Sequence, residues 1–101
     1  MSKSRDFVDV KVTETDIISL GFSITGVEGF GSSYTYILEE GDKDVVVQLW
    51  NSTSAYKYSL YVGVWPSDSK RLDTNTVRTY EDVRSLINLA QEIMKNHERY
   101  T

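Results

Sequence analysis

The sequence predicts an α+β fold: a short N-terminal helix, an antiparallel sheet of four to five strands, and a C-terminal helix packed across one face. In the stretch Thr79–Arg99, apolar residues recur at the i, i+3, i+4, i+7 spacing of one helical face. Three segments within 33–65 alternate with the period of two that is typical of strands. Because a lone amphipathic helix is barely stable in water, we expect this helix to cover the sheet.

The N-terminal part of the chain predicts the shorter helix. Residues 1–6 are polar and we expect them to be frayed, while the alternation over 7–12 favours a short edge strand. The sequence TETD from Thr13 resembles a capping box. The sequence LGF from Leu20 is typical of a Schellman end, with its glycine in the left-handed conformation. These signals predict a helix at about 14–20.

The middle of the chain predicts a β-meander. A strand begins at Phe22, and a loop rich in glycine and serine covers 26–33. This loop lacks the lysine and the following helix of a phosphate-binding loop, so we interpret it as a flexible connection. Short turn sequences then separate three antiparallel strands, which we predict at 33–40, 43–50 and 56–65.

The last connection, 66–78, is long and polar. Leu72 and Val77 are its only apolar anchors. We predict a loop here, with a short extra strand around 76–78 as the alternative.

Composition sets the broad class. The 101 residues form one domain, 1–101, with a net charge of −4 and no cysteine. This acidic balance makes nucleic-acid binding an unfavoured function. The sequence shows no leader and no run long enough to cross a bilayer, so a cytoplasmic protein is expected, in the host cytoplasm if the protein is viral.

Catalytic and metal-binding patterns have little support. His97 is the only histidine, and we expect it to cap or snorkel near the end of the C-terminal helix. The carboxylates around the turn after Glu40 lack the spacing of a calcium loop, so we interpret them as solvated. We therefore expect no enzymatic activity, no metal site and no cofactor.

The sheet face away from the C-terminal helix is the better candidate site. Aromatic residues with a polar tip are enriched at interfaces, which favours a non-enzymatic protein-binding module. The alternative is that the N-terminal segment and first helix cover this face as a second core. The candidate protein-binding residues on this face are Ile37, Trp50, Tyr61 and Trp65, and the alternation predicts that Val46 projects from it as well. If the face is a core, the functional surface is expected at the acidic turn, with Glu39, Glu40, Asp42 and Asp44, and at the 66–78 connection.

Two other partners fit the same residues. A small polar or nucleotide-like ligand could lie between this face and the 26–33 loop. Trp50, Tyr61 and Trp65 would stack on it, while Lys57 or Arg71 pairs with an anionic group. Such a ligand could also lie at the interface of a homodimer.

The segments TETDIISLGF, YTYILEE and TYEDVRSLINLA together resemble the layout of small proteins of phages and mobile elements. In these proteins a helix ending in Leu-Gly-Phe precedes a tyrosine-rich meander and a Thr-x-Glu-Asp helix. The resemblance implies inhibition of a host protein by direct binding. It transfers no individual site residue.

Overall fold

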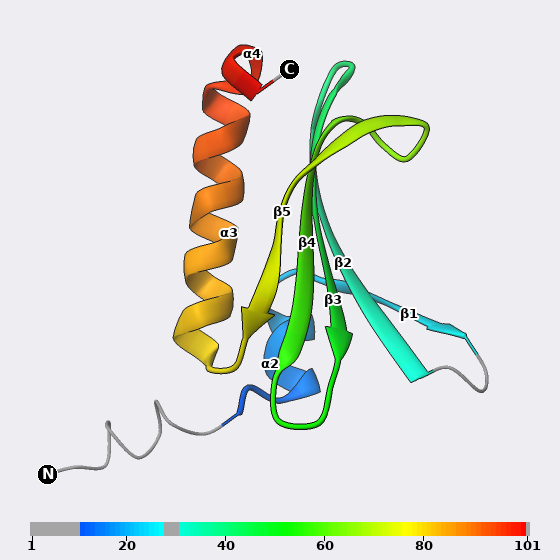
Figure 1. The fold of residues 1–101 in the computed structure, drawn as a ribbon, viewed down its shortest axis with the longest axis vertical. Helices are drawn as coiled ribbons and strands as arrows, with labels where there is room; N and C mark the ends of the chain where they lie inside the picture. Colours follow the sequence, from blue (N-terminus) through cyan, green and yellow to red (C-terminus); the bar gives the residue numbers. More distant parts are fainter. Residues whose placement is uncertain (1–10, 28–30, 101) are drawn as a thin grey trace, which may run out of the picture.

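The structure, a computed structural model, describes residues 11–27 and 31–100. A five-stranded antiparallel sheet runs in the order β1-β2-β3-β4-β5, and helices precede and follow it (Figure 1). The predicted α+β fold is confirmed. The strands are β1 (Ser23–Val27), β2 (Gly31–Glu40), β3 (Lys43–Asn51), β4 (Tyr56–Val64) and β5 (Asp68–Val77), and the helices are α2 (Glu14–Ser19), α3 (Tyr80–Lys95) and α4 (His97–Tyr100).

Both ends of α2 follow the predicted local signals. Thr13 Oγ1 accepts a hydrogen bond from the backbone N–H of Asp16 at 3.1 Å, which caps the first turn. At the other end, the N–H of Phe22 donates to the carbonyl of Ile17 at 3.3 Å. Gly21 lies between them with φ of 111°. This is the predicted Schellman geometry, and it turns the chain into β1.

The N-terminus of α3 is a complete capping box. Thr79 Oγ1 accepts from the N–H of Asp82 at 3.2 Å, and Asp82 Oδ2 accepts from the N–H of Thr79 at 3.0 Å. The predicted apolar face is buried, and its buried residues are Val83, Leu86, Ile87, Ala90 and Ile93.

The predicted helix over Thr79–Arg99 is too long by one turn. The structure ends α3 at Lys95, and Asn96 leaves the helical conformation with φ of −114° and ψ of 34°. The Asn96 side chain donates to the carbonyl of Glu92 at 3.1 Å, so an amide side chain caps the helix and α4 follows as a separate element. His97 lies at the start of α4 and is buried, so its side chain does not snorkel, which was one of the two expected roles.

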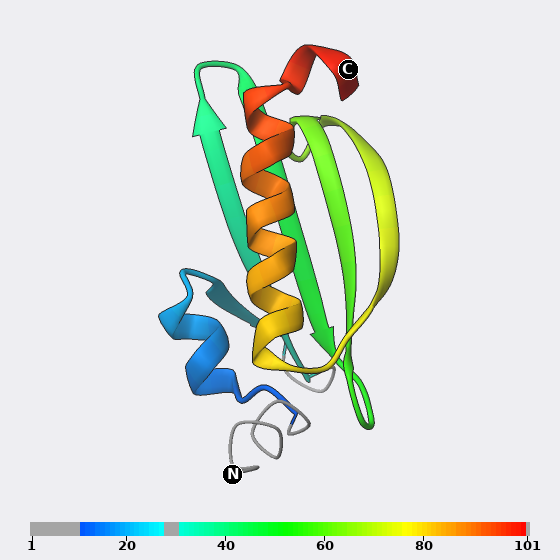
Figure 2. The same ribbon diagram turned by 90° about the vertical axis from the view of Figure 1, so that its left-hand side faces the viewer.

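Both α2 and α3 lie on the same face of the sheet, as the two views show (Figures 1 and 2). Ile17 and Phe22 belong to the same buried cluster as Val83 and Ala90. The expectation that the first helix could cover the opposite face is therefore wrong, because its apolar residues complete the α3 side of the core. No helix of the described part of the chain is long and apolar enough to cross a membrane.

The predicted loop over 66–78 is instead mostly a strand, β5, which pairs with β4 along its length. Its sequence does not alternate because it is an edge strand with exposed side chains on both faces. Val77 is buried and Leu72 packs on the core, so the two predicted anchors are in place. A register shift between Leu60 and Tyr61 marks an irregularity in the ladder.

The predicted glycine-rich loop over 26–33 is shorter than expected. β1 continues to Val27 and β2 begins at Gly31, because the two strands pair down to that point. Most of the predicted edge strand over 7–12, and the expected fraying of 1–6, lie outside the described residues. Val12 is described, and its N–H donates to the carbonyl of Arg78 at 2.7 Å, beyond the end of β5.

Candidate functional site

The sheet has one face without a helix among the described elements, and we call it the open face. Residues paired across neighbouring strands point to the same side, so the register defines its rows. From β2 to β5 the rows are Ser33, Trp50, Lys57 and Thr76; Thr35, Gln48, Ser59 and Thr74; Ile37, Val46, Tyr61 and Arg71; and Glu39, Asp44, Gly63 and Ser69.

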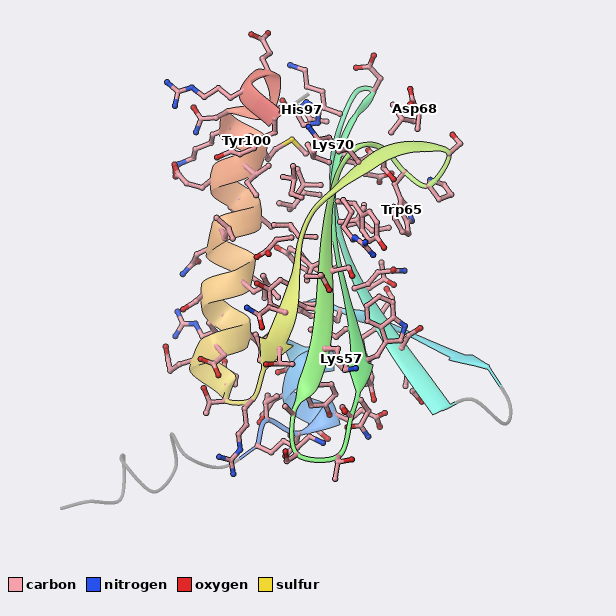
Figure 3. The ribbon with its side chains drawn as sticks, viewed as in Figure 1. Lys57, Trp65, Asp68, Lys70, His97 and Tyr100 are labelled. Atoms are coloured by element: carbon pink, nitrogen blue, oxygen red, sulfur yellow. The ribbon has the colours of Figure 1, made fainter. Side chains whose placement is uncertain are left out.

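The predicted aromatic residues do share the open face. Trp50 is 38% exposed and Ile37 is 43% exposed, which is high for large apolar side chains. Trp65 lies beyond the end of β4, but its ring packs on Tyr61 with 4.7 Å between ring centroids. Figure 3 shows Trp65 on the side of the sheet away from α3. The sequence therefore identified the composition of this face, although it placed Trp65 within a strand.

A tight turn carries Trp65 onto the sheet. Gly63 has φ of 133°, and a Cβ atom there would lie 2.5 Å from the backbone oxygen of Asp68. Only glycine permits this conformation and this approach of β5 to β4. The backbone N–H of Trp65 then donates to Asp44 Oδ2 at 2.8 Å. Sequence reasoning missed this turn, because the requirement for glycine at position 63 comes only from its positive φ and from the close approach of β5.

Two expectations about individual side chains are corrected here. Asp44 was expected to be solvated at the acidic turn, but it is buried and holds the Trp65 backbone. Val46 was expected to project from the open face, but it is fully buried. Tyr61 is the direct neighbour of Val46 on β4, and the Trp65 ring packs on the Tyr61 ring. We attribute the burial of Val46 to these two rings. The other acidic residues of the turn, Glu39, Glu40 and Asp42, are exposed as expected.

Two cations lie beside the aromatic residues. Lys57 is paired directly with Trp50, and Arg71 is paired directly with Tyr61. Both cations are exposed. The open face thus combines aromatic rings, hydroxyl groups and positive charge on a chain whose net charge is −4.

Three surface hollows lie away from these aromatic residues. Hollows of about 450 Å³ and about 460 Å³ share Lys43, His97 and Glu98, between α4 and the tips of two hairpins. Figure 3 shows His97 and Lys70 in this region. A third, of about 220 Å³, lies between α3 and the adjoining strands, where Leu89 is 42% exposed. Trp50 and Trp65 line none of the three.

The groups with shifted pKa values have structural partners. Burial and a hydrogen bond to Glu14 raise the pKa of Tyr34 to about 12. Burial and a hydrogen bond to Asp73 raise the pKa of Tyr58 to about 12. These tyrosines belong to the core under the helices, so their shifts do not indicate a catalytic site. Over residues 11–27 and 31–100, no group of three or more acidic or histidine side chains is placed to hold a metal ion.

Comparisons of this chain with protein-family models, with curated proteins and with solved structures found no match. The structure itself defines an architectural class: an α+β meander in which α2 and α3 pack on one face of the sheet.

Proposed function

We propose that this protein is a non-enzymatic binding module whose open face docks on a protein partner. The observation that carries the proposal is that α2 and α3 pack on one side of the sheet while Trp50 and Ile37 remain partly exposed on the other. Partly exposed tryptophan and tyrosine side chains are the residues that most often dominate binding energy at protein interfaces. Sequestration or inhibition of a host protein is the form of this function that the resemblance to small phage proteins suggests.

The position of Trp50 and Trp65 outside the three described hollows favours a macromolecular partner over a small ligand. Small-molecule sites are concave and bury most of the ligand, whereas the three hollows described above lie elsewhere. The rows of hydroxyl-bearing residues around the aromatic side chains resemble the polar rim of an interface.

The test compares two exposed apolar residues on opposite sides of the molecule. Trp50→Ser removes an aromatic residue from the open face, and Ile18→Ser removes a residue of α2 that is 45% exposed. We expect wild-type protein and Ile18→Ser to capture a partner from a host lysate, while Trp50→Ser stays folded and captures it at least tenfold less well. Recovery of no partner with folded protein in excess, or equal capture by both variants, would overturn the proposal.

Self-association is measured separately on the same proteins. Light scattering of the purified chain tells whether the partner is a second copy. In that case Trp50→Ser should shift the protein to the monomer, while Ile18→Ser should leave its size unchanged.

A second candidate function rests on the two cations. Lys57 beside Trp50, and Arg71 beside Tyr61, could each hold an anionic group next to a stacked ring. This arrangement favours a nucleotide-like ligand. Titration of tryptophan fluorescence with a panel of nucleotides should then saturate in the wild type and be lost in Lys57→Ala. A flat response across the panel eliminates this candidate.

A further inference from the structure

Strand β2 is paired with β1 along only half of its length. β1 pairs with Gly31 to Thr35, and its last pair joins Ser23 to Thr35. β2 continues to Glu40 and remains paired with β3 throughout. Among the described residues, Tyr36–Glu40 therefore has no neighbouring strand on its outer side, and we call this segment the free half of β2. Figure 2 shows it at the border of the sheet, above β1.

A free strand edge presents backbone N–H and C=O groups that can pair with another strand. At the opposite edge, β5 is protected in the ways that natural sheets use. Its ladder has an irregularity at Leu60/Tyr61, and its residues include Lys70 and Arg71 next to each other. The N–H of Val12 also donates to the carbonyl of Arg78, just beyond β5. The free half of β2 has no proline, lysine or register shift.

We propose that the free half of β2 accepts an extended segment of a protein partner as an added strand. This inference rests on the proposed function in one respect, namely that the partner is a protein. Ile37 belongs both to the free half of β2 and to the open face, so an added strand would widen that face beside its apolar row. Main-chain pairing of this kind gives affinity, and the flanking side chains give specificity.

The side chains of the free half of β2 define the chemistry of the segment. Ile37 and Leu38 favour apolar partners, while Glu39 and Glu40 are exposed and favour basic ones. Asp42 in the adjoining turn adds negative charge. If the partner segment adds antiparallel to β2, its residues from N- to C-terminus should therefore be basic, basic, apolar and apolar.

A second copy of this chain is a poor occupant. Two free halves of β2 paired antiparallel about Leu38 would place Glu39 opposite Ile37 and Glu40 opposite Tyr36 of the other copy. Each carboxylate would then face an apolar or aromatic side chain of the other copy, with no cation of that copy opposite it. The charge pattern fits a basic segment of a different protein.

The first test uses the full-length protein and a synthetic peptide, Thr-Thr-Lys-Lys-Val-Ile-Thr-Thr, with binding measured by calorimetry. N-methylation removes one backbone donor at a time. Alternate peptide residues point their N–H groups toward β2 and away from it, so we expect alternating effects: about a tenfold loss at one set of positions and little change at the other. No binding, or a uniform effect of N-methylation, would refute strand addition.

The second test examines the charge pattern. Glu39→Lys should weaken binding of the Lys-Lys peptide about fivefold and strengthen binding of the matching Glu-Glu peptide. Asp68→Lys makes the same change of charge at the other edge and serves as the matched control. Equal effects of the two substitutions would show only a general charge attraction and would overturn the proposal.

Failure of this inference is distinguishable from failure of the proposed function. Capture that depends on Trp50, without peptide binding at the free half of β2, would leave the open-face proposal standing and reject the added strand. Peptide binding with the alternating N-methylation pattern, but without an effect of Trp50→Ser on capture, would support the added strand and reject the open-face proposal.

Discussion

Gly63 and Gly41 both have positive φ angles, but the structure predicts very different costs for a methyl group at each. At Gly63, with φ of 133°, an added Cβ would lie 2.5 Å from the backbone oxygen of Asp68 and 3.0 Å from the Cα of Ser69. At Gly41, with φ of 65°, no atom lies within 4 Å of the added Cβ. The pair therefore separates backbone conformation from steric clash.

The expected magnitudes follow from these two terms. Gly41→Ala carries only the cost of the left-handed conformation, about 1 kcal/mol. Gly63→Ala adds a less accessible φ and a clash with backbone that cannot rotate away, so we expect a loss of about 3–5 kcal/mol. For a domain of this size, about 1 kcal/mol lowers Tm by roughly 4–8 °C. The first variant should then lose roughly 4–8 °C and the second more than about 12 °C.

The assays are urea unfolding, which gives the free energy of unfolding, and thermal melting, which gives Tm, for both variants. Tryptophan fluorescence is also recorded in the folded state. Because Gly63 permits the turn that packs Trp65 on Tyr61, we expect Gly63→Ala also to change the folded-state spectrum, while Gly41→Ala leaves it unchanged. Losses within about 1 kcal/mol of each other would refute the reasoning. They would mean that β5 does not approach β4 as closely as the structure shows.

Three further predictions concern hydrogen-bonded polar groups. Asp44→Ala removes the acceptor of the Trp65 N–H and should lower the free energy of unfolding by about 1–3 kcal/mol in the same urea assay. Asp44→Asn keeps an oxygen as acceptor and should lower the free energy of unfolding by less. Burial and a carboxylate hydrogen bond raise the pKa of Tyr34 from 10.0 to about 12. The contribution of Tyr34 to stability should therefore be complete below about pH 10 and be lost as the pH rises from about 10 to 12. Alkaline unfolding curves that Tyr34→Phe leaves unchanged would contradict this. The backbone hydrogen bond from Thr79 lowers the pKa of Asp82 below 3.8, so its contribution should be complete above about pH 4 and be lost on acidification; Asp82→Asn should flatten this acid limb in thermal melts.

Local sequence patterns determined much of this fold because they depend on residues only a few positions apart. The capping box at Thr79 and the glycine-ended helix before Phe22 formed as their sequences predict. The period-two alternation of β3 and β4 set which side chains share a face, so Trp50 and Tyr61 could be assigned to the same surface. The short turn at Gly41 set the pairing of β2 with β3.

Other features were decided only by contacts between distant segments. β5 is a strand because its backbone pairs with that of β4, although its polar sequence lacks the alternation of a strand. α2 packs beside α3 because both apolar faces complete one core, which leaves the open face without a helix from residues 11–27 and 31–100. Asp44 is buried because the turn at Gly63 delivers a backbone donor from a different hairpin. The free half of β2 exists because β1 is shorter than β2, and strand length at a sheet edge depends on pairing across the chain.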